Sequence, residues 1–374
     1  MRVVLVISVV YITFYSGYLN ISFAIAKKRN NKKDNWYLFF LVIAMAILGS
    51  SINPPSHGWD LYRHYEYLDE LKISNYGFFD YMFNDDNLLG GGTRSSLYGF
   101  KLLCYIVSKL DCNRMLPFLT LVSVYGIWCY ITQDWLIRKE KPELLAPSFM
   151  VCLATMPYVY VNTGIRNALA ASIVAWALYY EFEKKGSSLL TLLILLFSYT
   201  IHNAVIIVLP CWFLAHFSVN LKTVLLVVFG VLLFEPVAKY VYSHSIPGLS
   251  QAANLYLHYI SADAYFFSYG YLIVDIVFIL ITVYVFYYEN KNNSNKLYRF
   301  VLIYSATIMT QFRHYDLVLR PIYVLAMFSS IIVDSCYSLF KSKNGKTLLS
   351  ILILSSGLTA VVLHGPSYLL MDYL

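Results

Sequence analysis

The sequence predicts an all-α membrane protein that crosses the bilayer many times, and two observations carry this prediction. Hydrophobic residues make up 59% of the 374-residue chain and charged residues only 13%, whereas a soluble domain is about 25% charged. Long apolar runs also recur from end to end, each close to the roughly 20 residues that a helix needs to cross a bilayer. We therefore expect residues 1–374 to form a single integral membrane domain without a soluble module.

Counting the apolar runs predicts about twelve transmembrane helices, within a range of about ten to thirteen. The two runs that flank His202 are shorter than a full span, and we expect them to be tilted, broken or paired as half-membrane segments. The predicted spans are Val3–Ala26, Trp36–Ile52, Met115–Leu136, Leu144–Val161, Ile165–Phe182, Leu189–Thr200, Ala204–Phe217, Leu221–Tyr240, Ser268–Tyr287, Leu297–Phe312, Leu317–Leu339 and Leu348–Tyr368.

The basic loops set the predicted orientation. Cytoplasmic loops of membrane proteins are rich in Lys and Arg, so the net charge of +7 reflects topology rather than nucleic-acid binding. Loops 53–110 and 241–268 are then external. Within the first of them, Ser95–Leu110 is short and carries two lysines, which predicts an amphipathic or re-entrant helix on the external face. The segments assigned to the cytoplasm are Lys27–Lys33, Glu183–Gly186, Lys291–Lys296 and Lys341–Lys346.

Several charged residues stand where hydrocarbon is expected. A charge at the centre of a membrane helix costs about 2.5–3.5 kcal/mol, and such groups pair with each other, line a wet cavity or hold a charged ligand. The predicted topology brings them to one external cavity with the acidic loop that follows residue 53. Positive charges dominate there, which predicts an anionic ligand. The residues are Arg166, His202, Arg313, His314, Asp316 and Arg320.

The guanidinium groups of Arg166, Arg313 and Arg320 match phosphate oxygens in geometry and charge. Together they suit the diphosphate of a lipid carrier. The alternative is that they extend to the membrane surface or pair with an aspartate such as Asp316, Asp275 or Asp263. His202 suits a general base or a hydrogen-bond donor to substrate, and the alternative is an interfacial histidine bonded to a backbone carbonyl.

The external motif GWDLYRHYEYLDEL places four residues at i, i+3, i+4 and i+7, on one face of a helix. They are Asp60, Arg63, His64 and Tyr67. Acidic side chains here suit sugar hydroxyls or the proton of an attacking hydroxyl, and Arg63, His64, Tyr67 and His314 suit sugar or acceptor binding. The alternative is a solvated amphipathic helix with an Asp60–His64 pair. No metal-ligand spacing and no glycine-rich phosphate loop occurs in the sequence, so we expect neither metal nor cofactor.

At these residues the sequence resembles the EpsG/Wzy-type polysaccharide polymerases, which make O-antigen and capsule. The resemblance rests on an ordered set of motifs, namely Asp60 to Tyr67, Ile165-Arg166-Asn167-Ala168-Leu169-Ala170, His202-Asn203-Ala204 and Arg320-Pro321-Ile322-Tyr323. Two positions depart from the family pattern. Asn167 replaces a glutamine, and Thr93-Arg94-Ser95-Ser96 replaces an acidic entry to the next helix. The second departure leaves Asp60, Asp69 and His202 as candidate bases.

The resemblance implies a GT-C-like, metal-independent glycosyltransferase that inverts the anomeric centre. Such enzymes extend O-antigen or capsular polysaccharide on undecaprenyl diphosphate at the periplasmic face of the bacterial inner membrane. A flippase and a chain-length regulator of the same pathway are the implied partners. Two alternatives remain at this point: an O-antigen ligase or other lipid-linked-sugar transferase, and a flippase for the lipid-linked unit. A transporter is less favoured because the sequence shows no internal repeat and its charges gather at one face.

Overall fold

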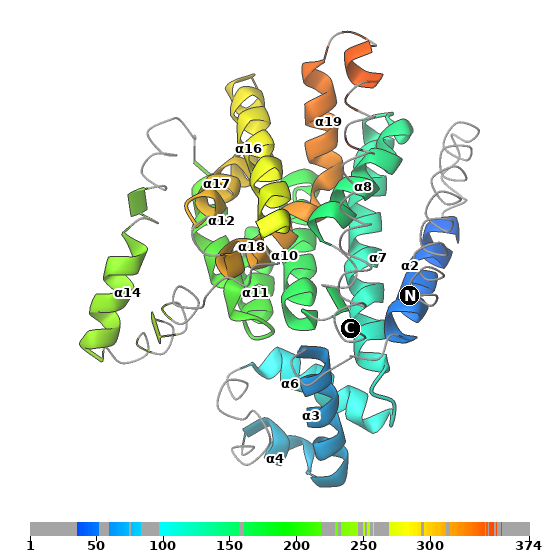
Figure 1. The fold of residues 1–374 in the computed structure, drawn as a ribbon, viewed down its shortest axis with the longest axis vertical. Coiled ribbons are helices and arrows are strands. Elements are labelled where there is room, and N and C mark those ends of the chain that lie inside the picture. The colour runs from blue at the N-terminus through cyan, green and yellow to red at the C-terminus, as the bar shows by residue number, and fades with distance from the viewer. Residues whose placement is uncertain are drawn as a thin grey trace.

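The computed structural model shows a bundle of helices with a smaller helical group against one end (Figure 1). It describes residues 36–51, 60–74, 76–83, 97–156, 161–162, 164–217, 233–245, 269–292, 295–311 and 315–340, with short pieces at 229–230, 250, 253–254, 257, 342, 344–347, 349 and 353. Each regular element in these ranges is a helix, which confirms the predicted all-α class.

The helices follow the chain in this order: α2 (Trp36–Ser51), α3 (Asp60–Ser74), α4 (Phe78–Phe83), α6 (Tyr98–Lys109), α7 (Met115–Arg138), η1 (Pro142–Leu144), α8 (Leu145–Thr155), α10 (Ile165–Lys184), α11 (Ser188–Tyr199), η2 (Asn203–Ile207), α12 (Val208–Ala215), α14 (Phe234–Ser243), α16 (Tyr269–Asn292), α17 (Lys296–Met309), α18 (Tyr315–Met327) and α19 (Ser329–Leu339).

The helix lengths only partly follow the predicted spans. Within the described ranges, α7 is long and apolar enough to cross a membrane by itself, and the bent pair Arg320–Met327 and Ser329–Leu339 gives a second span if it is counted as one. The predicted span Val3–Ala26 and most of Leu348–Tyr368 lie outside the described residues. The total of about twelve spans therefore stays a prediction.

Helix α10 forms the axis of the bundle, where it packs against α7, α11, α17 and α18. Small side chains allow helix backbones to approach one another closely inside a membrane protein, and α10 has many of them. Its buried small residues are Ala168, Ala170, Ala171, Ser172, Ala175 and Ala177. The small side chains of the sequence AASIVAWA thus allow α10 to pack closely against these four helices.

The segment after α10 is a broken hairpin. Helix α11 has 12 residues and α12 only 8, and 12 helical residues span about 18 Å against the ~30 Å of a bilayer core. Glu181 near the end of α10 accepts a hydrogen bond from Ser188 at the start of α11 (2.6 Å) and contacts Nε2 of His216 just after α12 (2.8 Å). The hairpin therefore turns at the far end from Glu181, at His202, as its two short apolar runs predict.

The predicted span Leu317–Leu339 is two helices rather than one. Helices α18 and α19 meet at a bend of 66° around Phe328. The indole N–H of Trp128 in α7 donates to the hydroxyl of Ser329 at 2.9 Å, and Ser329 is fully buried. This hydrogen bond holds the start of α19 against α7. A hydropathy pattern cannot reveal such a bend because both helices are apolar.

Helices α3, α4 and α6 form a small group below the bundle in Figure 1, which we call the cap. The predicted helix Ser95–Leu110 appears as α6, with Phe100, Cys104 and Val107 on its buried face. Lys101 is buried inside the cap as well, at 1% exposure, where its Nζ donates to the carbonyl of Met82 at 2.9 Å. The centroid of the Tyr81 ring lies 5.1 Å from this ammonium group, and the cation–π contact helps to stabilise the buried positive charge.

Candidate functional site

The first turn of α10 supplies the first part of the site. Its N-cap is Gly164, which has no side chain to cap the helix, and Arg166 is the second residue of the helix. The N-terminus of a helix carries partial positive charge and unsatisfied N–H groups. The half-buried Arg166 adds a full charge at the same place. Both features favour an anion.

Helix α18 brings a second arginine to this turn. The side-chain amide of Asn167 donates to the backbone carbonyl of Arg320 at 3.2 Å. Asn167 directly follows Arg166 in α10, so the hydrogen bond ties the two arginine-bearing turns together. Arg320 is half-buried. The sequence separation of about 150 residues between these positions gives no hint of their proximity.

His202 completes the group, in the turn between α11 and η2. It is 7% exposed, and its backbone N–H donates to the carbonyl of Ser198 at 3.0 Å. Burial, followed by the positive charges of Arg320 and Arg166, holds the pKa of His202 well below its ordinary value. His202 is the N-cap of η2, which packs against both α10 and α18, the helices that carry the two arginines. We call Arg166, His202 and Arg320 the arginine site.

The hydrogen bond at Nδ1 determines which tautomer His202 adopts. The backbone N–H of Ala204 donates to this nitrogen at 3.2 Å, so Nδ1 is an acceptor. A neutral imidazole with an acceptor Nδ1 carries its proton on Nε2. In this state His202 can donate a hydrogen bond to a ligand through Nε2 but cannot take a proton there. Of its two predicted roles, the geometry favours the hydrogen-bond donor.

The cap reaches the arginine site through the first turn of α6. The backbone N–H groups of Gly99 and Phe100 both point to the carbonyl of Thr200, at 3.1 and 3.4 Å, two residues before His202. The ring of Phe100 lies 5.6 Å from the guanidinium carbon of Arg166. His64 of α3 also packs against that ring, with 5.0 Å between the ring centroids. The cap and the bundle thus meet at this point.

The four loop residues predicted on one helical face are in α3, but they divide between two environments. His64 and Tyr67 are buried, each 1% exposed, while Asp60 and Arg63 are exposed. The Tyr67 hydroxyl pairs with that of Tyr81 at 2.8 Å. Asp60 contacts Arg63 at 3.8 Å, which replaces the Asp60–His64 pair considered above. The division arises because α3 packs its inner face on α6.

The remaining predicted residues are less informative. Asp69 is exposed at the far end of α3, where it accepts a hydrogen bond from Asn113 at 2.8 Å and lies 3.6 Å from Lys72. The hydrogen bond from Asn113 ties the cap to the start of α7. Arg313 and His314 lie outside the described residues. Within the described part of the chain, no group of three or more His, Cys, Asp or Glu residues is arranged to hold a metal ion.

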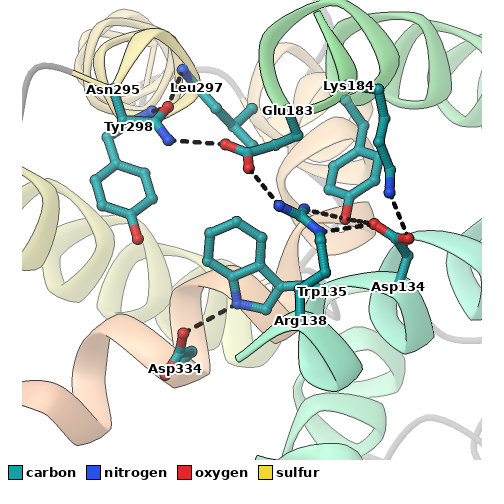
Figure 2. A network of polar contacts seen from close by, with 10 residues as sticks. Asp134, Trp135, Arg138, Glu183, Lys184, Asn295, Leu297, Tyr298 and Asp334 are labelled. Atoms are coloured by element: carbon teal, nitrogen blue, oxygen red, sulfur yellow. Dashed lines mark hydrogen bonds and ion pairs between the residues drawn. The ribbon is translucent and has the colours of Figure 1, made fainter. Parts of the chain in front are cut away.

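The opposite end of α10 carries a network of ion pairs, which we call the carboxylate end (Figure 2). Arg138 of α7 binds Asp134 at 3.0 Å and Glu183 at 3.1 Å, and Lys184 binds Asp134 at 2.6 Å. Asn295 donates to Glu183 at 2.8 Å. Trp135 and Lys141 both bind Asp334 of α19. The network joins the last turns of α7 and α10 to the middle of α19 and to the start of α17.

Comparison with known proteins decides the family. A model of the EpsG family matches residues 36–368. The chain belongs to the EpsG family. This family includes Wzy-type polymerases, so the resemblance predicted from the motifs is confirmed. EpsG membership supports a polysaccharide polymerase-like glycosyltransferase role and a membrane location. No curated protein and no solved structure matches the chain.

Sequence reasoning missed the residues that assemble this EpsG-family site. Asn167 stood out only as a departure from the family motif, and the structure gives it a partner in Arg320. Gly99 and Phe100 gave no signal beyond their place in an amphipathic segment. A glycine next to an aromatic residue at a helix start is a weak hint of close backbone approach. The partner, Thr200, could not have been found from that pattern.

Proposed function

We propose that this EpsG-family protein polymerises undecaprenyl-diphosphate-linked oligosaccharide repeat units into O-antigen or capsular polysaccharide. In this proposal it is a multi-pass protein of about twelve spans in the bacterial inner membrane, and the arginine site faces the periplasm. The observation that carries the proposal is the packing of α10, α18 and η2 against one another, which brings Arg166, Arg320 and His202 together from three helical segments. Two fixed cations and a neutral hydrogen-bond donor suit a diphosphate.

The proposed reaction is a direct displacement. A hydroxyl of the acceptor repeat unit attacks the anomeric carbon of the growing chain, the bond from that carbon to the diphosphate oxygen breaks, and the diphosphate leaves with the electron pair. Arg166 and Arg320 stabilise the charge that develops on the leaving group, and Nε2 of His202 donates to one of its oxygens. Arg313 is proposed as a third cation and His314 as a sugar contact. A single displacement inverts the anomeric centre and needs no metal.

The proton of the attacking hydroxyl requires a base. Asp60 is the better candidate in the cap, since its carboxylate is exposed and lies one helical turn before His64, which contacts Phe100 at the arginine site. Asp69 is already engaged by Asn113 and Lys72. In this arrangement Arg63 contacts sugar beside Asp60, while His64 and Tyr67 support the surface from beneath. Asp60→Asn is expected to lower the transfer rate about 100-fold or more.

The test measures the polysaccharide ladder from cells that lack the gene and carry either wild type or a variant at matched membrane levels. Arg166→Ala is expected to leave a single repeat unit where wild type gives a ladder. Arg299→Ala is the matched control, because Arg299 lies near the carboxylate end, where it donates to the carbonyl of Phe217 at 3.1 Å. The Arg299→Ala variant is expected to restore the ladder. A full ladder with Arg166→Ala would contradict the proposed site.

The same strains separate the alternatives. Cells without the gene are expected to attach one repeat unit to their acceptor lipid, because ligation and export still operate. A complete loss of surface sugar in those cells would instead favour a ligase or a flippase. A flippase and a chain-length regulator of the same pathway are proposed partners. The flippase would deliver the repeat unit to the arginine site, and the regulator would set the length of the product.

A further inference from the structure

Phe100 stands between the cap and the arginine site. It is the third residue of α6 and is 1% exposed. The guanidinium carbon of Arg166 lies 5.6 Å from its ring centroid, within the range of a cation–π contact. His64 packs against the ring at 5.0 Å with the two planes inclined at 53°. The cap therefore supplies the aromatic surface on which one of the two proposed diphosphate-binding arginines rests.

The residue before it sets how close this surface comes. A Cβ atom on Gly99 would lie 2.6 Å from Oγ1 of Thr200 and 2.8 Å from Cγ1 of Ile201, which is shorter than such contacts allow. The missing side chain lets the N–H groups of Gly99 and Phe100 reach the Thr200 carbonyl. Those donors belong to the first turn of α6, where helical N–H groups need outside partners. Gly99 thus fixes α6 against the turn that contains His202.

We propose that Phe100 is a positioning residue for the glycosyl transfer, which rests on the function proposed above. Its ring orients the guanidinium of Arg166 so that the planar fork of N–H groups faces the diphosphate. The Arg166 side chain then loses less conformational freedom when the lipid-diphosphate substrate binds. An aromatic face attracts the cation without bringing a negative charge. A carboxylate in the same place would compete with the diphosphate for the same N–H groups.

The decisive experiment compares aromatic with aliphatic side chains at position 100. Phe100→Leu keeps an apolar side chain but removes the ring, and Phe100→Tyr and Phe100→Trp keep one. Membrane vesicles are given a synthetic lipid-diphosphate oligosaccharide at saturating concentration, and the initial rate of chain extension is measured per molecule of folded protein. We expect about a tenfold lower rate for Leu and a rate within about threefold of wild type for at least one of the two aromatic variants. Equal rates for Leu and wild type, or equal losses for all three, would overturn the proposal.

A glycine pair tests the close approach in the same assay. Gly99→Ala forces α6 away from Thr200 and is expected to lower the rate about as much as Phe100→Leu. Gly126→Ala in α7 is the matched control, because the added Cβ meets no heavy atom within 4 Å outside its chain neighbours and the nearby backbone of its own helix. We expect wild-type activity for this variant. An unchanged rate for Gly99→Ala counts against the proposal.

The Arg166→Ala ladder separates this inference from the function on which it rests. If Arg166→Ala abolishes polymerisation while Phe100→Leu has no effect, only the role of Phe100 is wrong. If Arg166→Ala polymerises normally, the proposed site itself is wrong, whatever Phe100 does.

Discussion

Arginines lie at both ends of helix α10, and their surroundings differ between the two ends. At its last turns, Arg138 is held by two carboxylates, those of Asp134 and Glu183. At its first turn, some 30 Å away for a 20-residue helix, Arg166 rests on an aromatic ring and lies near Arg320 and a neutral His202. An arginine bound to carboxylates is neutralised and joins helices. Arginines gathered around an uncharged donor create a field that favours an anion.

The largest expected effect is on activity at the arginine site. Arg320→Ala is expected to lower polymer formation by about 100- to 1,000-fold, the usual cost of removing one donor to a developing negative charge. Arg320→Lys should recover only part of the loss, because an ammonium cannot bind two phosphate oxygens in a planar fork. The measurement is the initial rate of chain extension at matched protein levels. Equal rates for Lys and Arg would show that charge alone suffices.

A smaller loss of activity is expected at His202. His202→Ala removes the proposed Nε2–H donor and should lower the rate about 10- to 100-fold. His202→Gln keeps an N–H donor and should retain more activity than the alanine variant. This ranking follows from the tautomer that Ala204 imposes. If Gln is as inactive as Ala, a proton-accepting role for His202 becomes the better explanation.

The carboxylate end is expected to affect stability instead. Arg138→Ala leaves the carboxylate of Glu183, 7% exposed, without one of its partners and is expected to lower the free energy of unfolding by about 2 kcal/mol. The rate per folded molecule should stay within about twofold of wild type, since the change lies at the opposite end of α10. Thermal unfolding in detergent measures the loss of stability, and the rate assay measures the activity per folded molecule. A selective loss of activity would mean that this end also serves catalysis.

His202 also predicts a modest pH dependence of stability. Its pKa lies well below the ordinary 6.5 in the folded protein, so the unfolded chain binds the proton more readily. His202 therefore has little effect on the free energy of unfolding well above about pH 6.5. The free energy of unfolding falls as the pH drops below that value, because only the unfolded chain takes up the proton. Between pH 7.5 and 5.5 the free energy of unfolding falls by about 1.4 kcal/mol. Unfolding measured at both pH values should show this difference in wild type and not in His202→Gln.

The smallest effect is expected at Asp69. This exposed carboxylate contacts Asn113 and Lys72, and such surface contacts contribute about 0–1 kcal/mol. Asp69→Asn should leave the transfer rate within about twofold of wild type, in contrast to Asp60→Asn. A large loss of activity for Asp69→Asn would exchange the two proposed roles in the cap.

Local pattern was enough to predict the helices and part of the site. The apolar runs predicted α7 and α10 to within a few residues. The short runs around His202 predicted segments that are tilted, broken or paired as half-membrane segments, and the structure shows two short helices on either side of a turn. Arg166 and His202 stood out because a charged or polar group in an apolar run is costly wherever it occurs. The periodicity of α3 could not show which residues of one face would be buried, since that depends on where α6 packs.

The sequence by itself determined that this protein is helical, that apolar segments dominate it and that a few polar residues within them are exceptional. These properties follow from composition and spacing along the chain, which hydropathy records. The tertiary structure alone decided that Asn167 meets Arg320, that Gly99 allows α6 to reach Thr200 and that Phe100 lies under Arg166. The physical reason is that these are contacts across packed helices. They depend on small side chains and bends at particular points, and neighbouring residues in the chain carry no information about them.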